Sequence, residues 1–229
     1  MSHSLTIALY LLGSYLLGSL PFGLWIAWQW KHVDIRTVGS GNIGSTNVFR
    51  ICGPIAGTLV FALDMLKGLL PPLVGRYLLH LEAETQWLIL SGLLGIVGHN
   101  FSVWLGFKGG KGIATSAGVL IGICPWAALG VVIVFFVTLL LFRWVSLGSL
   151  MTAVTLPIFI YFFYPKDYYL LAFGLVAGVM AIYRHRGNIQ RLFAGTEPKV
   201  NLFKRKSDAN PPGSDPEDHT SAPSPEAPQ

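Results

Sequence analysis

Long apolar stretches recur along most of this chain, and they constrain its fold more than any other feature. A transmembrane helix needs roughly 20 apolar residues, and helices inside a bundle can be shorter. Only 12% of the residues are charged, about half the share in a typical soluble domain. The sequence predicts an all-α integral membrane protein with seven transmembrane helices, some of them short, at 5–30, 53–79, 86–105, 112–123, 125–142, 146–163 and 168–183.

The fourth and fifth of these helices could instead be one. Residues 112–142 would then form a helix about 46 Å long, at about 1.5 Å per residue, which exceeds a hydrocarbon core of about 30 Å. Pro125 offers a break, because proline lacks the backbone N–H that a helix interior requires. We therefore predict two short helices here, and seven spans rather than six.

The placement of basic residues favours the same number of spans. With the N-terminus outside, thirteen of the 16 Lys and Arg residues lie in inner segments, Arg76 and Lys166 lie outside, and Lys67 lies within the membrane. Cytoplasmic segments of membrane proteins carry such an excess of positive charge. Six spans would place the late basic segments opposite the early ones. We therefore predict an outside N-terminus and a cytoplasmic C-terminus.

The end of the chain has a different composition from the rest. From Ser207 onwards it is rich in Pro, Ser and acidic residues and almost devoid of apolar ones. Such a segment cannot bury enough apolar surface to fold. We predict that residues 1–200 form one membrane domain and that residues 201–229 form a disordered cytoplasmic tail.

Three polar segments fall on the predicted inner face, and each holds more hydrogen-bonding groups than a plain connection needs. They are VGSGNIGSTNVFR at 38–50, GHNFSVWLGFKGGKGIATSAG at 98–118 and YRHRGNIQRLFAGTE at 183–197.

The middle segment contains the sequence KGGKG. Gly109, Gly110 and Gly112 would let backbone N–H groups converge on an anion, because glycine permits the required backbone angles and close approach. Lys108 and Lys111 would add full positive charges. The alternative is a flexible basic loop that only follows the positive-inside rule.

The first segment has a dense run of hydrogen-bonding side chains followed by Arg50, whose guanidinium suits a phosphate in a bidentate way. The alternative is a capped turn before the second helix. The run consists of Ser40, Asn42, Ser45, Thr46 and Asn47.

The third segment contains His185, a possible acid, base or phosphate donor. Asn188 lies three residues on, so both would face one side of a helix. The alternative is a basic anchor for anionic lipid.

Asp64 and Lys67 lie three residues apart in an apolar helix, and we expect a buried ion pair with a structural role. His99 and Asn100 close the third helix, and we expect a hydrogen-bonded structural histidine there. Carboxylates are scarce in and near the three polar segments, with only Asp34 and Glu197. This scarcity argues against a divalent-metal site, so we expect no metal and no cofactor.

The motifs GSGNIGSTNVFR, DMLKG, GHNFSVWLGFKGGKGIATSAG and RHRGNIQRLFAGTE resemble those of the bacterial acyl-phosphate:glycerol-3-phosphate acyltransferases, over about residues 5–200. The resemblance implies a seven-helix membrane enzyme that moves a fatty acyl group from acyl phosphate to the 1-hydroxyl of sn-glycerol 3-phosphate. The products would be lysophosphatidic acid and inorganic phosphate, in the first step of phospholipid biosynthesis. The site would face the cytoplasm at the bacterial inner membrane.

The resemblance also implies residue roles. The catalytic residues would be Lys111, Ser40, His185 and Arg50. The substrate-binding residues would be Asn42, Thr46, Asn47, Lys108, Gly109, Gly110, Gly112, Asn188 and Glu197. The expected partners are acyl phosphate, glycerol 3-phosphate and membrane lipids, with no nucleic acid and no obligate protein partner.

The implied chemistry fits these residue types. An acyl phosphate is already an activated mixed anhydride, so neutralisation of the leaving phosphate and positioning of the hydroxyl supply most of the catalysis. The base would be His185 or a phosphate oxygen of a substrate, and we favour the phosphate. Acyltransferases with a His-x4-Asp motif use other donors, and none of the 6 His residues has Asp five positions later.

Two other classes of protein share some of these features. An organophosphate transporter would also combine many helices with an inner anion site, but it should place polar groups on both sides. A structural membrane anchor would need basic loops, but it would not need the Ser-, Asn- and Thr-rich run at 40–47.

Overall fold

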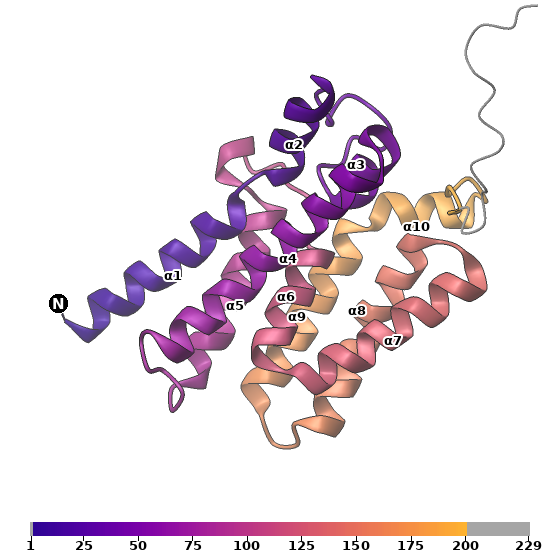
Figure 1. Cartoon of the computed structure of the whole chain (residues 1–229). Helices are drawn as coiled ribbons and strands as arrows, with labels where there is room; N and C mark the ends of the chain where they lie inside the picture. The colour runs from indigo at the N-terminus through magenta and orange to yellow at the C-terminus, as the bar shows by residue number, and fades with distance from the viewer. Residues whose placement is uncertain (1, 201–229) are drawn as a thin grey trace, which may run out of the picture.

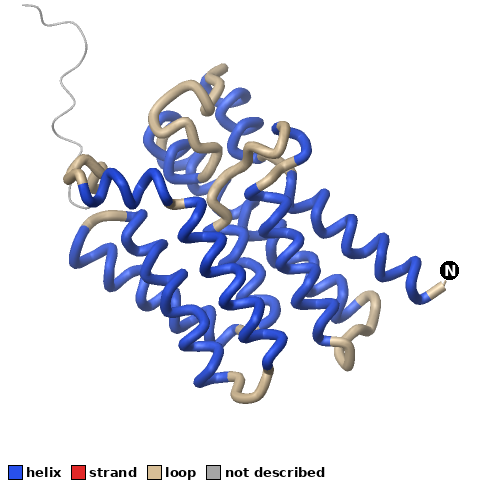
Figure 2. Tube along the Cα trace, turned by 180° about the vertical axis from the view of Figure 1, so that it is seen from behind, coloured by secondary structure: helices blue, strands red, loops and turns tan. Residues whose placement is uncertain are grey.

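The computed structural model describes residues 2–200, and every regular element in that range is a helix (Figures 1 and 2). The predicted tail at 201–229 lies outside the described residues. In chain order the helices are α1 (His3–Ser19), α2 (Phe22–Lys31), α3 (Ser45–Cys52), α4 (Pro54–Tyr77), α5 (Thr85–Asn100), the 3-10 helix η1 (Val103–Leu105), α6 (Ile113–Ile123), α7 (Pro125–Phe142), α8 (Val145–Phe163), α9 (Tyr168–Arg184) and α10 (Arg186–Phe193).

The helices confirm an integral membrane protein. Five segments are long and apolar enough to cross a membrane: His3–Lys31, Pro54–Tyr77, Thr85–Leu105, Pro125–Phe142 and Val145–Phe163. A sixth is possible if α9 and α10, which meet at a bend of 58°, form one broken span. The apolar helix α6 is shorter, with 11 residues. The count of seven spans and the orientation of the termini stay predictions.

The first predicted span is not one continuous helix. It breaks at Leu20 and Pro21, and α2 restarts at Phe22. Proline has no N–H to continue the helical hydrogen bonds. The side chain of Lys67, from α4, donates to the carbonyl oxygen of Leu20 at 2.7 Å and so satisfies a group that the break exposes. The predicted break at Pro125 is confirmed, since α6 ends at Ile123 and α7 starts at Pro125.

The short helix α6 packs very closely against α4. A Cβ atom added to Gly118 would lie 1.9 Å from the carbonyl oxygen of Met65, and one added to Gly68 would lie 2.1 Å from that of Thr115. Small residues allow such close backbone contact between membrane helices, where dispersion rather than the hydrophobic effect drives association. These two glycines therefore fix α6, and the loop before it, against the bundle.

The two ends of the bundle differ in what they carry (Figure 1). One end, the loop-rich end, gathers α2, α3, α10 and the connection 101–112. The opposite end holds the N-terminus and the connections 78–84, 124 and 164–167. All three predicted polar segments therefore lie at the same end.

Candidate active site

The KGGKG loop rests on the end of α5. The N–H groups of Gly109 and Gly110 donate to the carbonyl oxygens of Asn100 (3.1 Å) and His99 (3.0 Å). A Cβ atom on Gly109 would lie 2.0 Å from the His99 carbonyl oxygen, and one on Gly110 would lie 2.1 Å from His99 Nε2. Both positions need glycine because the loop touches α5 so closely.

This contact corrects one expectation about the loop. The amides of Gly109 and Gly110 donate within the protein, so they do not face an anion as predicted. The N–H groups of Lys111 and Gly112 have no hydrogen-bond partner within residues 2–200, and α6 begins at the next residue. The backbone of Gly112 is in the left-handed region, with φ +82°. The free end of α6 therefore carries the backbone donors that the loop as a whole was expected to supply.

Arg184, at the end of α9, holds the other side of the same loop. Its Nε donates to the carbonyl oxygen of Gly110 at 2.9 Å, and its Nη2 donates to that of Gly109 at 2.6 Å. Its guanidinium also lies 5.4 Å from the ring centre of Phe101. Sequence reasoning gave Arg184 no specific partner, although its position directly before His185 placed it in the right segment.

A chain of polar contacts joins the loop to α10 and to the residues beyond it. Lys111 Nζ donates to Asn188 Oδ1 at 2.5 Å, and Asn188 Nδ2 donates to Glu197 Oε1 at 2.7 Å. Arg191 Nε donates to the second oxygen of Glu197 at 2.7 Å. Lys111, Asn188 and Glu197 were predicted site residues, whereas Arg191 was not. The signal that could have found Arg191 is its position three residues after Asn188 on one helix.

The charged side chains around Lys111 favour a bound anion beside it. Burial lowers the pKa of Lys111 to about 8, and the positive charges of Arg191, Arg50 and Arg184 oppose the attraction of Glu197. A cation crowded by other cations gains most from a bound anion.

Glu197 stays ionised within this cationic group. Burial favours its neutral form, but the neighbouring Ser146 hydroxyl and the hydrogen bonds from Asn188 and Arg191 outweigh it and hold the pKa of Glu197 below its usual value. A carboxylate that accepts two side-chain donors fixes both of them in place. Glu197 therefore orients Asn188 and Arg191 rather than facing a negatively charged ligand.

His185 lies at the junction of α9 and α10 and is buried, with 3% of its surface exposed. Its Nδ1 lies 2.8 Å from the carbonyl oxygen of Ala181, so Nδ1 carries the proton and Nε2 offers a lone pair. Burial, together with the charge of Lys111, lowers the pKa of His185 to about 4. At neutral pH the ring is therefore uncharged, a hydrogen-bond acceptor but a weak base.

The segment 38–47 is organised by Asn47, which is 2% exposed. Its Nδ2 donates to the carbonyl oxygens of Ile35, Val38 and Asn42 at 3.0–3.2 Å, and its Oδ1 accepts from the Ser40 N–H at 3.0 Å. Both ends of this side chain are used by the backbone, which differs from the predicted contact with substrate.

Other predicted residues of this segment remain open to a ligand. Ser40, Thr46 and Arg50 are exposed. Thr46 and Arg50 lie four residues apart on α3, on one face of the helix. The side chain of Asn42 instead accepts from the Gly44 N–H at 2.8 Å and shapes the turn before α3. Lys108 is exposed at the start of the KGGKG loop.

Glu197 reaches the site because the chain after α10 is fastened to the α7–α8 connection. The indole Nε1 of Trp144 donates to the carbonyl oxygen of Glu197 at 3.0 Å, and the ammonium of Lys199 lies 4.8 Å from the Trp144 ring centre. The Val200 N–H donates to the carbonyl oxygen of Arg143 at 2.8 Å. Nothing in the local sequence indicated this role for Trp144.

The predicted ion pair in α4 is present. Lys67 Nζ lies 2.8 Å from Asp64 Oδ1, and His99 Nδ1 lies 3.6 Å from the same oxygen. All three side chains are buried within the bundle.

The fold and the site together define a membrane-embedded helical protein with a cluster of cationic and polar side chains at one end. The family model for glycerol-3-phosphate acyltransferase matches residues 8–195. The chain therefore belongs to the glycerol-3-phosphate acyltransferase family.

Curated relatives and solved structures agree with this assignment. A glycerol-3-phosphate acyltransferase of Geotalea daltonii is 44% identical over 85% of this chain and 96% of its own length. One of Bacillus subtilis is 43% identical over 85% of this chain and 97% of its own length. The glycerol 3-phosphate form of PlsY (YgiH), an integral membrane glycerol 3-phosphate acyltransferase, has a TM-score of 0.79 and 40% identity, over 86% of this chain and 96% of that one. Its lysophosphatidic acid form has a TM-score of 0.77 and 39% identity.

Proposed function

We propose that this protein transfers a fatty acyl group from acyl phosphate to the 1-hydroxyl of sn-glycerol 3-phosphate. Its membership of the glycerol-3-phosphate acyltransferase family supports the reaction class. The observation that carries the proposal is the contact of Lys111 with Asn188 at the N-terminal end of α6, because these groups suit phosphate and lie close to the neutral His185.

The two phosphates have different requirements. The glycerol 3-phosphate dianion suits the exposed Ser40 and Arg50 together with Lys111 and Asn188. The leaving phosphate suits the free N–H groups of Lys111 and Gly112 and the start of α6. Thr46 and Lys108 are further donors within the same end of the bundle. Asn42, Asn47, Gly109, Gly110 and Glu197 act by holding these groups in position.

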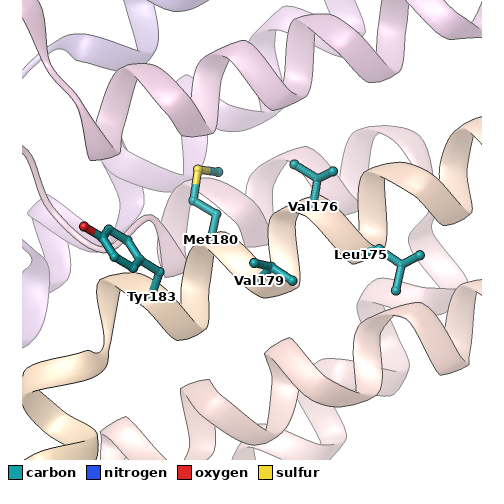
Figure 3. Close-up of a pocket in the computed structure, with 5 residues that line it drawn as sticks. All are labelled: Leu175, Val176, Val179, Met180 and Tyr183. Carbon is teal, nitrogen blue, oxygen red and sulfur yellow. The ribbon is translucent and has the colours of Figure 1, made fainter.

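The fatty chain could lie along the exposed apolar face of α9. Leu175, Val176, Val179, Met180 and Tyr183 form an open apolar surface there (Figure 3). Tyr183 ends the row directly before Arg184. An acyl chain lying on this surface would bring its polar head towards the KGGKG loop.

The reaction then needs no covalent intermediate on the protein. The 1-hydroxyl oxygen attacks the acyl carbonyl carbon, the bond between that carbon and the phosphate oxygen breaks, and inorganic phosphate leaves. Lys111 and the backbone donors stabilise the charge on the leaving phosphate. His185 Nε2 accepts a hydrogen bond from the hydroxyl and orients it. Since the pKa of His185 is lowered to about 4 and that of a phosphate monoester is about 6, the proton goes to a substrate phosphate oxygen.

The same proposal includes the placement of the protein. The loop-rich end would face the cytoplasm at the bacterial inner membrane, because the basic residues gather there and both phosphorylated substrates are expected on that side. Single cysteines introduced for Thr37 and Lys166 should differ in intact cells. A membrane-impermeant maleimide should label Lys166→Cys and not Thr37→Cys; the reverse pattern would invert the topology.

The test of the reaction is phosphate release by the purified full chain with palmitoyl phosphate, with and without glycerol 3-phosphate. Release should require both substrates and should fall at least about 100-fold in Lys111→Ala, as expected for loss of a donor to a developing anion. The exposed Lys166, at the opposite end, provides the matched control, and Lys166→Gln should keep full activity. Release without glycerol 3-phosphate would indicate a hydrolase. No release, with uptake of glycerol 3-phosphate into vesicles, would indicate a transporter.

A further inference from the structure

Three buried ionisable side chains of α4 and α5 have no part in the proposed chemistry. Asp64, Lys67 and His99 are 2–3% exposed, and we call them the buried ion cluster. Burying charge among membrane helices is costly and is usually tied to a specific task. Asp64 joins the other two members, and Lys67 and His99 each have a contact outside the cluster that leads to a different part of the candidate site.

Lys67 connects the cluster to the first polar segment. Besides its ion pair with Asp64, its ammonium donates to the carbonyl oxygen of Leu20 at 2.7 Å and lies 5.4 Å from the ring centre of Phe22. Both contacts fall at the break between α1 and α2. The cluster therefore sets where α2 starts and which way it runs.

Helix α2 in turn supports the segment 38–47. A Cβ atom added to Gly23 would lie 1.7 Å from the carbonyl oxygen of Ile43. Ile43 is itself buried, between Asn42 and Gly44. A shift of α2 would therefore move the backbone that carries Ser40 and precedes α3, which carries Arg50.

His99 connects the cluster to the KGGKG loop. Its Nδ1 faces Asp64, and its Nε2 is so close to Gly110 that a Cβ atom there would lie 2.1 Å away. The His99 carbonyl oxygen accepts from the Gly110 N–H at 3.0 Å. The imidazole therefore fills the space between the carboxylate of Asp64 and the backbone directly before Lys111.

We propose that the buried ion cluster is a positioning device that sets the spacing between the two phosphate-binding segments, 38–47 and 108–112. Asp64, Lys67 and His99 are positioning residues: Lys67 contacts the start of α2, His99 contacts the loop before Lys111, and Asp64 joins the two. Two phosphates held by separate segments must be kept at the distance that the transfer requires, and small errors in such distances are costly. This inference rests on the proposed acyl transfer.

The main variant is Asp64→Asn with Lys67→Met, which removes both charges together and leaves no single charge buried. The matched control is Tyr10→Phe. The Tyr10 hydroxyl is another buried tie between helices, donating to the Pro71 carbonyl oxygen at 2.8 Å and lying 2.6 Å from Ser91 Oγ, but it contacts neither polar segment. His99→Gln serves as a second variant that should affect mainly 108–112.

The first readout is kinetic. The double variant should raise KM for both glycerol 3-phosphate and palmitoyl phosphate by about tenfold or more, whereas Tyr10→Phe should leave both within about twofold at a similar loss of thermal stability. Unchanged KM values in a folded double variant would overturn the proposal. So would equal increases in Tyr10→Phe, because the effect would then reflect general loosening of the bundle.

The second readout is amide hydrogen exchange in the full chain, which needs no activity and so separates this inference from the proposed function. The double variant should accelerate exchange of the Ser40 amide and of the Gly109 and Gly110 amides together. His99→Gln should accelerate the two glycine amides more than that of Ser40. Acceleration in neither segment, or in only one of them for the double variant, would refute the linkage. If the wild type were inactive with palmitoyl phosphate, the proposed reaction would fail and the exchange result would still decide this inference.

Discussion

The connections at the opposite end of the bundle bond mostly to their own neighbours, with one long-range hydrogen bond from the Trp126 N–H to the Tyr164 hydroxyl at 3.3 Å, whereas the KGGKG loop at the loop-rich end bonds to two other helices, α5 and α9. At the opposite end, Asp167 caps α9 by accepting from the Leu170 N–H at 2.9 Å, and the Leu81 N–H donates to the Gly75 carbonyl oxygen at 3.0 Å. At the loop-rich end, Arg184 donates to Gly109 and Gly110, and Lys111 donates to Asn188. A connection that bonds mostly to itself can change with little effect elsewhere, whereas the KGGKG loop depends on both α5 and α9.

Gly110→Ala should disrupt the contact between the KGGKG loop and α5, with the largest expected loss of activity among these variants. The new methyl group would collide with His99 Nε2, so the loop would have to move away from α5 and carry Lys111 with it. We expect kcat/KM to fall by about 100-fold, as for other small displacements of a positioning group. The control is Gly13→Ala in α1, where an added Cβ meets nothing within 4 Å. Full activity in Gly110→Ala would show that the contact with α5 is not needed.

The pH dependence of kcat/KM should show whether activity requires the positive charge on Lys111. A lysine must be protonated to hold an anion, and the pKa of Lys111 is lowered to about 8. The kcat/KM of the free enzyme should therefore fall as pH rises through about 8, by about tenfold at one unit above that value. Lys111→Arg, whose side chain stays protonated to above about pH 12, should be less active but should lose this alkaline fall. The same alkaline fall in Lys111→Arg would assign the titration to another group.

Trp144→Phe should test whether the α7–α8 connection also supports the candidate site. It removes the indole N–H that holds the Glu197 carbonyl oxygen and keeps an aromatic ring for Lys199. The loss of one hydrogen bond of about 1 kcal/mol should lower kcat by about fivefold. Trp126→Phe, at the exposed start of α7 on the opposite end, should leave kcat unchanged. Equal activity in both variants would place Trp144 outside the support of Glu197.

Asp167→Ala should have the smallest effect on activity. It removes the side-chain cap of α9 at the opposite end, which should cost about 1 kcal/mol of stability. The midpoint of thermal unfolding should fall while both KM values stay the same. A change in either KM would mean that the two ends are coupled through α9.

Much of the fold could be predicted from the sequence, because apolar runs and basic segments are direct consequences of the membrane environment. The break at Pro125 also follows from local chemistry. The break at Leu20 was missed although Pro21 lies there, because the apolar run continues through it and the compensating group, Lys67, comes from a distant helix.

The candidate site also contains residues that could be predicted from the sequence and contacts that could not. Lys111 and Asn188 could be found because their residue types suit the chemistry, and Glu197 because the family resemblance implied it; the structure brings the three together. The internal use of the Gly109 and Gly110 amides, the occupied side chain of Asn47 and the fastening by Trp144 could not be found. Each depends on which backbone group a distant segment presents, and no local pattern records that.

The shortness of α6 has a consequence for how the two substrates meet. Its 11 residues rise by about 16 Å, against about 27 Å for the 18 residues of α7, at about 1.5 Å per residue. The two helices meet at Cys124, where α6 ends and α7 begins, so by rise alone the KGGKG loop, at the far end of α6, lies well below the level that α7 reaches. Under the proposed reaction, glycerol 3-phosphate would therefore have to pass below the level of the loop-rich end, whereas acyl phosphate would stay near the depth of its own fatty chain.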